Sequence, residues 1–339
     1  MIIVTAVALA VGGAVVWGYK ALKPPPPNIC GSPNGPPITS PRVKLNDCRH
    51  LAYREDGVPK QKAKYKFIIV HGFAVHKEQR IPTPKEVIEE LGIYFLHYDR
   101  AGYGESDLYP SRSLKSEAFD IEQLADKLNI DKFYVLGCSI GCYPIWSCLK
   151  YIPHRLLGAA LLTPFVNFWW PCLPANLAKE SFELLPKPYQ NTYRVARYAP
   201  WLFYWWMTQK WFPYLKIQPH LRVLVFTEKD IKIENNMEDN GHQEQVVQQG
   251  VYDSMHRDLM VAHGKWEFDP LDIANPFPNN EGSVHLWQGY QDKVIPYKIT
   301  RFLSEKLPWI TYHEIPDGGH MFFFEPHVCA SMLKTFFLK

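Results

Sequence analysis

The sequence of 339 residues lacks the patterns that mark several classes of protein. No block of basic residues occurs and the net charge is only +3, so the electrostatic footprint of a nucleic-acid-binding protein is missing. Apolar residues make up 47% and charged residues 21% of the chain, which excludes a disordered chain and a protein with many membrane spans. We therefore expect a globular protein with one large domain or two smaller ones.

Paired cysteine motifs and glycosylation sites are also absent. The seven cysteines include no C-x-x-C pair of the kind found in zinc and redox sites, and no Asn-x-Ser/Thr sequon occurs. An odd number of cysteines in a chain of this size indicates reduced thiols. We expect a domain outside the secretory lumen, with no metal ion and no cofactor.

The first nineteen residues contain no charged side chain. Their length matches the ~20 residues that cross a bilayer as a helix. A cleaved signal peptide begins with positive residues, whereas Lys20 and Lys23 follow the apolar run. We therefore expect residues 1–20 to be a transmembrane anchor. A buried helix and a cleaved signal are the alternatives. The positive-inside rule places the remaining chain in the cytosol, and we expect the membrane to be that of the endoplasmic reticulum.

Residues 21–41 form a proline-rich segment that contains eight of the 29 prolines. Proline at this density prevents both a helix and a central strand. We expect a stiff linker that, if extended, spans up to roughly 50 Å between the membrane and the domain.

Beyond residue 42, short apolar runs alternate with helical patterns. We expect a strand pair within residues 43–53 and strands over 67–70, 93–98, 133–136, 156–162, 284–287 and 310–314. Apolar residues recur at helical spacing over residues 113–128, and an amphipathic helix is expected over 143–151. This alternation predicts an α/β protein with a mostly parallel central sheet flanked by helices.

The strongest chemical motif is Gly-x-Ser-x-Gly at residues 137–141. A predicted strand precedes it and a predicted helix follows it, as the nucleophile elbow of a serine enzyme requires. Both glycines are needed because a side chain at either position would collide with neighbouring backbone. The turn would expose Ser139 as a nucleophile.

A serine nucleophile needs a base, and the base needs a carboxylate that orients it. On this kind of scaffold the acid and then the histidine follow the serine, each just after a strand. Asp292 and His320 occupy these positions, so we expect a triad of Ser139, Asp292 and His320. The rival acid, Asp317, lies in a Pro-Asp-Gly-Gly sequence that favours a turn-forming role.

The developing oxyanion needs two hydrogen-bond donors. We expect the backbone N–H of Ile140, which follows the nucleophile, and that of Phe73, which follows the His71-Gly72 turn at the end of a predicted strand.

These segments together resemble the α/β-hydrolase superfamily over roughly residues 41–339. The motifs that carry the resemblance are His71-Gly72-Phe73, Asp99-Arg-Ala-Gly-Tyr-Gly-Glu-Ser-Asp107, Gly137-Cys-Ser-Ile-Gly141, Asp292 and Gly-Gly-His320. Residues 35–42 and 258–270 are similar to a membrane-anchored plant branch that is esterase- or lipase-like. The resemblance implies that Ser139 is the nucleophile, Asp292 the orienting acid and His320 the general base. The chain departs from lipases and carboxylesterases after Gly72, where a Gly-Gly run is replaced by Phe-Ala-Val.

The resemblance also implies a hydrolase core at residues 42–163 and 283–339, with a helical cap inserted at 164–282. The cap is rich in aromatic residues, and we name four tryptophans as candidates for contact with a hydrophobic substrate: Trp169, Trp170, Trp205 and Trp206. Two alternatives remain, that the aromatic rings form the cap's own packing core or that the segment 201–211 contacts the bilayer interface. The polar run 228–249 is expected to be a loop followed by a helix that begins near Gln243.

The predicted function is that of a serine esterase, which cleaves a carboxylic ester of a hydrophobic small molecule through an acyl-enzyme intermediate. Two other classes stay open. One is a hormone-like small-molecule receptor on the same fold, and the other is a lyase or cyclase of specialised metabolism. The sequence does not indicate a protein partner, an oligomeric state or a particular substrate.

Overall fold

A computed structural model describes residues 12–13, 18–237 and 242–337 of the chain. The anchor predicted over residues 1–20 falls mostly outside these ranges. Within the described ranges, every helix is too short or too polar to cross a bilayer.

The centre of the molecule is a mixed sheet with the strand order β1-β2-β4-β3-β5-β6-β7-β8. β2 pairs antiparallel with both β1 and β4, and all other neighbouring strands are parallel, which confirms the predicted mostly parallel sheet. The strands are β1 (Arg42–Lys44), β2 (His50–Gly57), β3 (Tyr65–Val70), β4 (Ile93–Tyr98), β5 (Phe133–Cys138), β6 (Leu156–Leu162), β7 (Ser283–Gly289) and β8 (Ile310–Ile315).

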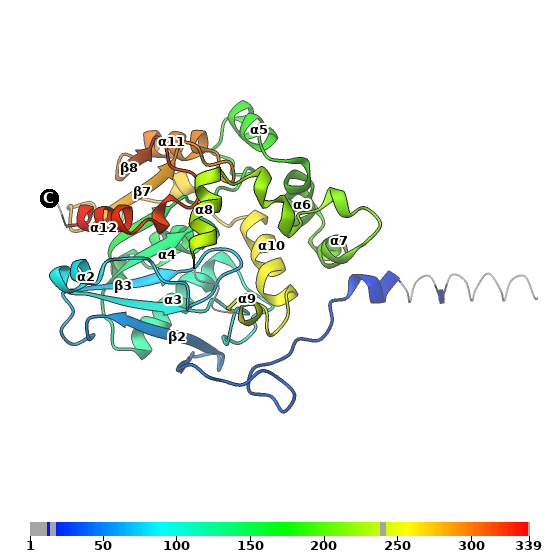
Figure 1. The fold of residues 1–339 in the computed structure, drawn as a ribbon, viewed down its shortest axis with the longest axis horizontal. Helices are drawn as coiled ribbons and strands as arrows, with labels where there is room; N and C mark the ends of the chain where they lie inside the picture. Colours follow the sequence, from blue (N-terminus) through cyan, green and yellow to red (C-terminus); the bar gives the residue numbers. More distant parts are fainter. Residues whose placement is uncertain (1–11, 14–17, 238–241, 338–339) are drawn as a thin grey trace, which may run out of the picture.

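Helices cover both faces of this sheet (Figure 1). Alternate residues of the central strands belong to two separate apolar clusters, because successive side chains of a strand point to opposite faces. One cluster includes residues of α3, α4 and α11, and the other includes residues of α2 and α12. These helices are α2 (Lys85–Leu91), α3 (Leu114–Lys127), α4 (Cys142–Tyr151), α11 (Tyr297–Lys306) and α12 (Pro326–Thr335).

A long helical insertion separates β6 from β7, and we call residues 164–282 the cap. Its helices α6 and α7 lie at one end of the molecule (Figure 1). The cap helices are α5 (Ala175–Glu183), α6 (Lys187–Tyr198), α7 (Phe203–Thr208), α8 (Glu228–Asn236), α9 (His242–Val246) and α10 (Arg257–His263).

The prediction of a loop that begins at residue 228 is wrong, because helix α8 begins there. Thr227 accepts a hydrogen bond from the backbone N–H of Asp230, and the Asp230 carboxylate accepts one from the N–H of Thr227. This capping box satisfies the first donors of the helix, although α8 has too few apolar residues for a periodic signal. The later helix, expected near Gln243, corresponds to α9.

A buried cluster of charges joins the cap to the core. Asp258, on α10, accepts hydrogen bonds from Arg100 at 2.6 and 2.7 Å, from Arg112 at 2.6 Å, from Tyr103 at 2.7 Å and from Tyr143 at 2.8 Å. All five side chains are buried. Burial alone would raise the pKa of Asp258, but the two arginines hold this pKa well below its usual range. The carboxylate therefore stays ionised and binds α10 to the loops that follow β4.

The proline-rich linker lies on the domain surface from Asn28 onward, which differs from the extended spacer expected from its composition. Glu105 accepts hydrogen bonds from the backbone N–H groups and hydroxyls of Thr39 and Ser40, at 2.6 to 3.0 Å. Cys30 is buried, and its N–H donates to the side chain of Gln249 at 3.0 Å. The linker thus contacts both the core and the cap.

Candidate active site

Ser139 occupies a strained turn between β5 and α4. Its φ is 53°, in the left-handed region that a residue with a side chain rarely adopts. A Cβ atom on Gly137 would lie 2.5 Å from the carbonyl oxygen of Gly141, and one on Gly141 would lie 2.5 Å from those of Val70 and His71. The turn is therefore possible only with glycine at both positions, as the motif predicts.

The structure brings the three predicted triad residues together. His320 Nε2 lies 3.0 Å from Ser139 Oγ, and His320 Nδ1 lies 2.8 Å from Asp292 Oδ2. The other carboxylate oxygen of Asp292 accepts hydrogen bonds from the N–H groups of Val294 and Ile295, at 2.8 and 2.9 Å. These contacts fix Asp292 in the orientation that holds the imidazole with Nε2 toward the serine.

The rival acid does not take part in this arrangement. The side chain of Asp317 is 78% exposed and forms an ion pair with Lys229. The turn-forming role predicted for Asp317 agrees with its position just after β8.

The electrostatic environment favours the protonated form of His320. Burial alone would lower the pKa of His320, but the charge and hydrogen bond of Asp292 and the charge of Asp230 outweigh this effect, so the pKa is raised above its usual value. An imidazolium formed during proton transfer from Ser139 would be stabilised by the same two carboxylates.

Asp230 and Phe226, both in the cap, contact the histidine loop, and sequence reasoning missed both. Asp230 Oδ1 accepts a hydrogen bond from the backbone N–H of Met321 at 2.7 Å, and a Cβ on Gly319 would lie only 2.2 Å from Asp230 Oδ2. The ring of Phe226 stacks on that of His320 with a centroid distance of 6.0 Å. The capping-box sequence from Thr227 to Asp230 is visible in the chain, but it contains no signal that connects it with residue 320.

The loop that carries Phe73 lies against the nucleophile turn. A Cβ on Gly72 would be 3.8 Å from the Cβ of Ser139. The Gly72 carbonyl is held by His71 Nδ1 at 2.9 Å and by the Arg100 guanidinium at 3.3 Å. Because a trans peptide directs its N–H opposite to its C=O, these two contacts set the direction of the Phe73 N–H.

His71 serves as a neutral structural group in this loop. Its Nε2 accepts a hydrogen bond from the backbone N–H of Arg100 at 3.1 Å, which leaves Nδ1 as the donor to Gly72. Burial, followed by the nearby positive charge of Arg100, lowers the pKa of His71 well below its usual value. Arg100 therefore connects the loop before Phe73 with Asp258 in the cap.

The four candidate tryptophans have contacts within the cap or with the neighbouring core helix. Trp170 is buried against Trp146 and Trp266, which supports the packing alternative for this ring. Trp169 packs on Phe182, as well as on a tyrosine of α6. The indole N–H of Trp206 donates to Thr192 at 3.0 Å, and Trp205 contacts Trp211 edge to face.

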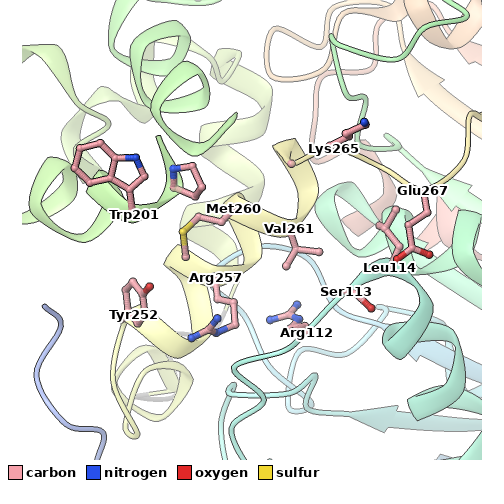
Figure 2. A pocket seen from close by; sticks show the side chains of 12 residues that line it. Arg112, Ser113, Leu114, Trp201, Tyr252, Arg257, Met260, Val261, Lys265 and Glu267 are labelled. Atoms are coloured by element: carbon pink, nitrogen blue, oxygen red, sulfur yellow. The ribbon is translucent and has the colours of Figure 1, made fainter. Parts of the chain in front are cut away.

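A cavity of about 430 Å³ lies between the cap and the start of α3 (Figure 2), and its lining includes none of the triad residues. Trp201 and Tyr252 line one side, and Lys265 and Glu267 line the other. The arginines of the lining have partners in the protein, since Arg112 bonds Asp258 and Arg257 bonds Asp253. Within the described ranges, no group of three or more potential ligands is placed to hold a metal ion.

Comparisons with known proteins identify the same fold. The sequence profile of the alpha/beta hydrolase fold matches residues 65–326, whereas no curated protein matches the chain. Among solved structures, the chain is similar to the enol-lactonase from Burkholderia xenovorans LB400, with 14% identity, a TM-score of 0.60, and coverage of 88% of this chain and 100% of that one.

Two esterases are also similar in structure. The thermophilic esterase from Thermogutta terrifontis has 17% identity and a TM-score of 0.55, and the esterase EaEST from Exiguobacterium antarcticum has 15% identity and a TM-score of 0.57. In each case the match covers 88% of this chain and 98% of the other. At these identities the likeness establishes a common fold.

Proposed function

Because the chain belongs to the alpha/beta hydrolase fold family, we propose that it is a serine hydrolase that cleaves a carboxylic ester of a hydrophobic substrate. The observation that carries this proposal is the continuous hydrogen-bonded series from Ser139 through His320 to Asp292. Similar structures include esterases and a lactonase, whose substrates contain the same type of carbonyl carbon.

The geometry supports an acyl-enzyme mechanism. Ser139 Oγ attacks the ester carbonyl while His320 Nε2 accepts its proton, and the N–H groups of Ile140 and Phe73 donate to the oxyanion. The imidazolium then protonates the leaving alcohol as the C–O bond breaks. His320 next removes a proton from water as the water attacks the acyl carbon, and it then returns the proton to Ser139 Oγ as the acyl C–O bond breaks, which releases the acid and free Ser139.

Labelling with a fluorophosphonate probe tests this mechanism, with the variant Ser139→Ala as control. We expect strong labelling of the wild type and none of the variant, because the probe reacts only with an activated serine. Folded wild-type protein that remains unlabelled would contradict the proposal.

Turnover of a chromogenic medium-chain ester measures the contribution of each triad residue. Ser139→Ala and His320→Ala should each lose at least ~10³-fold and Asp292→Asn about 10⁴-fold in kcat. Full activity of Ser139→Ala would exclude acyl-enzyme formation.

Two further measurements distinguish the alternative functions. Mass analysis of the products separates ester cleavage from elimination or rearrangement. A single slow turnover coupled to binding of another protein would indicate a receptor.

We also propose that residues 1–20 anchor the protein in the endoplasmic reticulum membrane, with the domain in the cytosol. The uncharged run and the following lysines support this orientation. The cysteines of the described chain are free thiols, as expected in a reducing compartment. Protease digestion of intact microsomes should degrade the domain without detergent, and protection of the domain would place it in the lumen.

A further inference from the structure

One segment of the cap has charged residues of a single sign. We call residues 184–227, from the end of α5 to the residue before α8, the cap surface. These 44 consecutive residues contain no aspartate or glutamate. They contain six cationic residues, Lys187, Arg194, Arg197, Lys210, Lys216 and Arg222.

Most of this positive charge is not neutralised by the protein. Within the described part of the chain, Arg222 is the member of this set that forms an ion pair, with Glu234. The ammonium group of Lys216 donates to the carbonyl oxygens of Met207 and Gln209, which leaves its charge uncompensated. The cap surface therefore attracts anions.

The same surface exposes large aromatic rings. Tyr198 and Trp201 are each 68% exposed, Tyr214 is 67% exposed and Trp211 is 62% exposed. Rings of this size are normally covered in a water-soluble protein. Tryptophan and tyrosine, which have an apolar ring and a polar edge, favour the boundary between lipid chains and water.

The cap surface and the start of the chain lie at the same end of the molecule. In Figure 1, α6 and α7 project toward the end at which the helical turn of residues 18–22 is found. The uncharged residues 1–19 are joined to that turn.

We propose that the cap surface docks on the anionic headgroup layer of a lipid bilayer. Its cations would contact lipid phosphates and carboxylates, while the exposed rings insert at the level of the headgroups. A second copy of the chain fits this surface less well, because two patches that both carry excess positive charge repel each other.

The chain that forms the docked surface continues directly into the candidate active site. Phe226, near its end, stacks on His320, and Asp230 of the following helix bonds the histidine loop. A hydrophobic substrate that partitions into the bilayer would thus be concentrated beside the cap. The docking itself does not require hydrolysis, so Ser139→Ala protein should bind lipid like the wild type.

Hydrogen exchange of the full chain on vesicles tests the proposal. Vesicles of phosphatidylcholine are compared with vesicles that also contain phosphatidylserine, so that the chain can insert residues 1–20 in both. We expect protection of residues 198–224 on the anionic vesicles and little on the neutral ones. Equal protection on both, or none on either, would overturn the proposal.

Variants separate the contributions of rings and charges. Trp201→Ala/Trp211→Ala should abolish the protection, and Lys210→Gln should weaken it about fivefold, the usual effect of one basic residue at an anionic membrane surface. Lys127→Gln, on α3 outside the cap surface, is the matched control and should have no effect on the protection. If light scattering instead shows a dimer that these substitutions dissociate, the surface binds a second copy and the proposal is wrong.

Discussion

At the scale of single residues, the position of His320 depends on two carboxylates that reach it by different routes. Asp292 bonds the ring directly, whereas Asp230 bonds the backbone of the next residue from a cap helix. Asp230 thus acts on the base through the loop, and also through its charge, which raises the pKa of His320.

We predict that Asp230→Asn moves the acidic limb of the pH–kcat/KM profile to lower pH. The base must be neutral to accept a proton, so activity rises with pH through the pKa of His320. Loss of the Asp230 charge lowers this pKa, while the asparagine oxygen still accepts the hydrogen bond of Met321 and the amide NH2 replaces the oxygen that accepted from the Thr227 N–H. Asp317→Asn removes an exposed charge from the same loop and is the control, with an unchanged limb. An unshifted limb for Asp230→Asn would show that its charge does not reach the base.

The strained backbone of Ser139 lowers the stability of the protein at the residue that catalysis requires. We expect Ser139→Gly to be about 1 kcal/mol more stable than Ser139→Ala, because glycine has no Cβ to clash at a φ of 53°. Thermal unfolding of the two inactive variants gives this difference. Equal stability would indicate that the turn tolerates a side chain without strain.

The triad residues could be predicted from the sequence because each lies in a local motif at the end of a predicted strand. Gly-x-Ser-x-Gly and the chain order of acid and histidine were sufficient. Asp230 and Phe226 could not be found in this way, since their approach to His320 depends on how the cap folds over the sheet.

At the scale of elements, the buried Asp258 cluster determines how the cap is held. Its two arginines come from the loop after β4 and the residues before α3. The segment 258–270 carries a family resemblance in the sequence, and the structure gives Asp258 a physical role.

We predict that Asp258→Asn lowers the free energy of unfolding by about 3 to 5 kcal/mol, because the buried guanidinium of Arg100 loses its counter-charge and that of Arg112 keeps only Glu117. Urea denaturation measures the loss. Lys85→Gln, which removes an exposed pair with Glu89 on α2, should cost less than about 1 kcal/mol. A similarly small effect of Asp258→Asn would mean that water enters the cluster.

The central strands, β3 to β7, were predictable because they are short, largely apolar runs that are mostly buried on both faces. The cap helices were harder to predict. Several are held by polar or aromatic contacts between distant segments, such as Trp206 with Thr192, and their sequences have no regular period. The start of α8 is determined by its capping box alone.

At the scale of the whole molecule, the linker is part of the folded domain. Burial alone would raise the pKa of Glu105, but hydrogen bonds from Thr39 and Ser40 lower it to about 2. Since this is below the ordinary value of 4.5, Glu105 contributes stability that is fully present above that value and is lost as the pH falls toward 2.

We predict that Glu105→Gln detaches the linker, with a loss of about 2 kcal/mol because charged acceptors form the stronger hydrogen bonds. Limited proteolysis at neutral pH should then cleave residues 28–41 much faster than in the wild type. Glu305→Gln, an exposed change on α11, is the control. Unchanged cleavage would mean that the contacts of Cys30 and Gln249 are sufficient.

The docked linker also determines the reach of the domain. Because the chain is held from Asn28 onward by Gln249, the free tether behind an anchor shortens from the 21 residues of the linker to the seven residues 21–27. Effective concentration falls roughly as the −3/2 power of tether length, so a threefold shorter tether raises it about fivefold. With the proposed anchor, the domain would encounter the membrane as an intramolecular partner, and the frequency of this encounter would be independent of the protein's abundance in the cell.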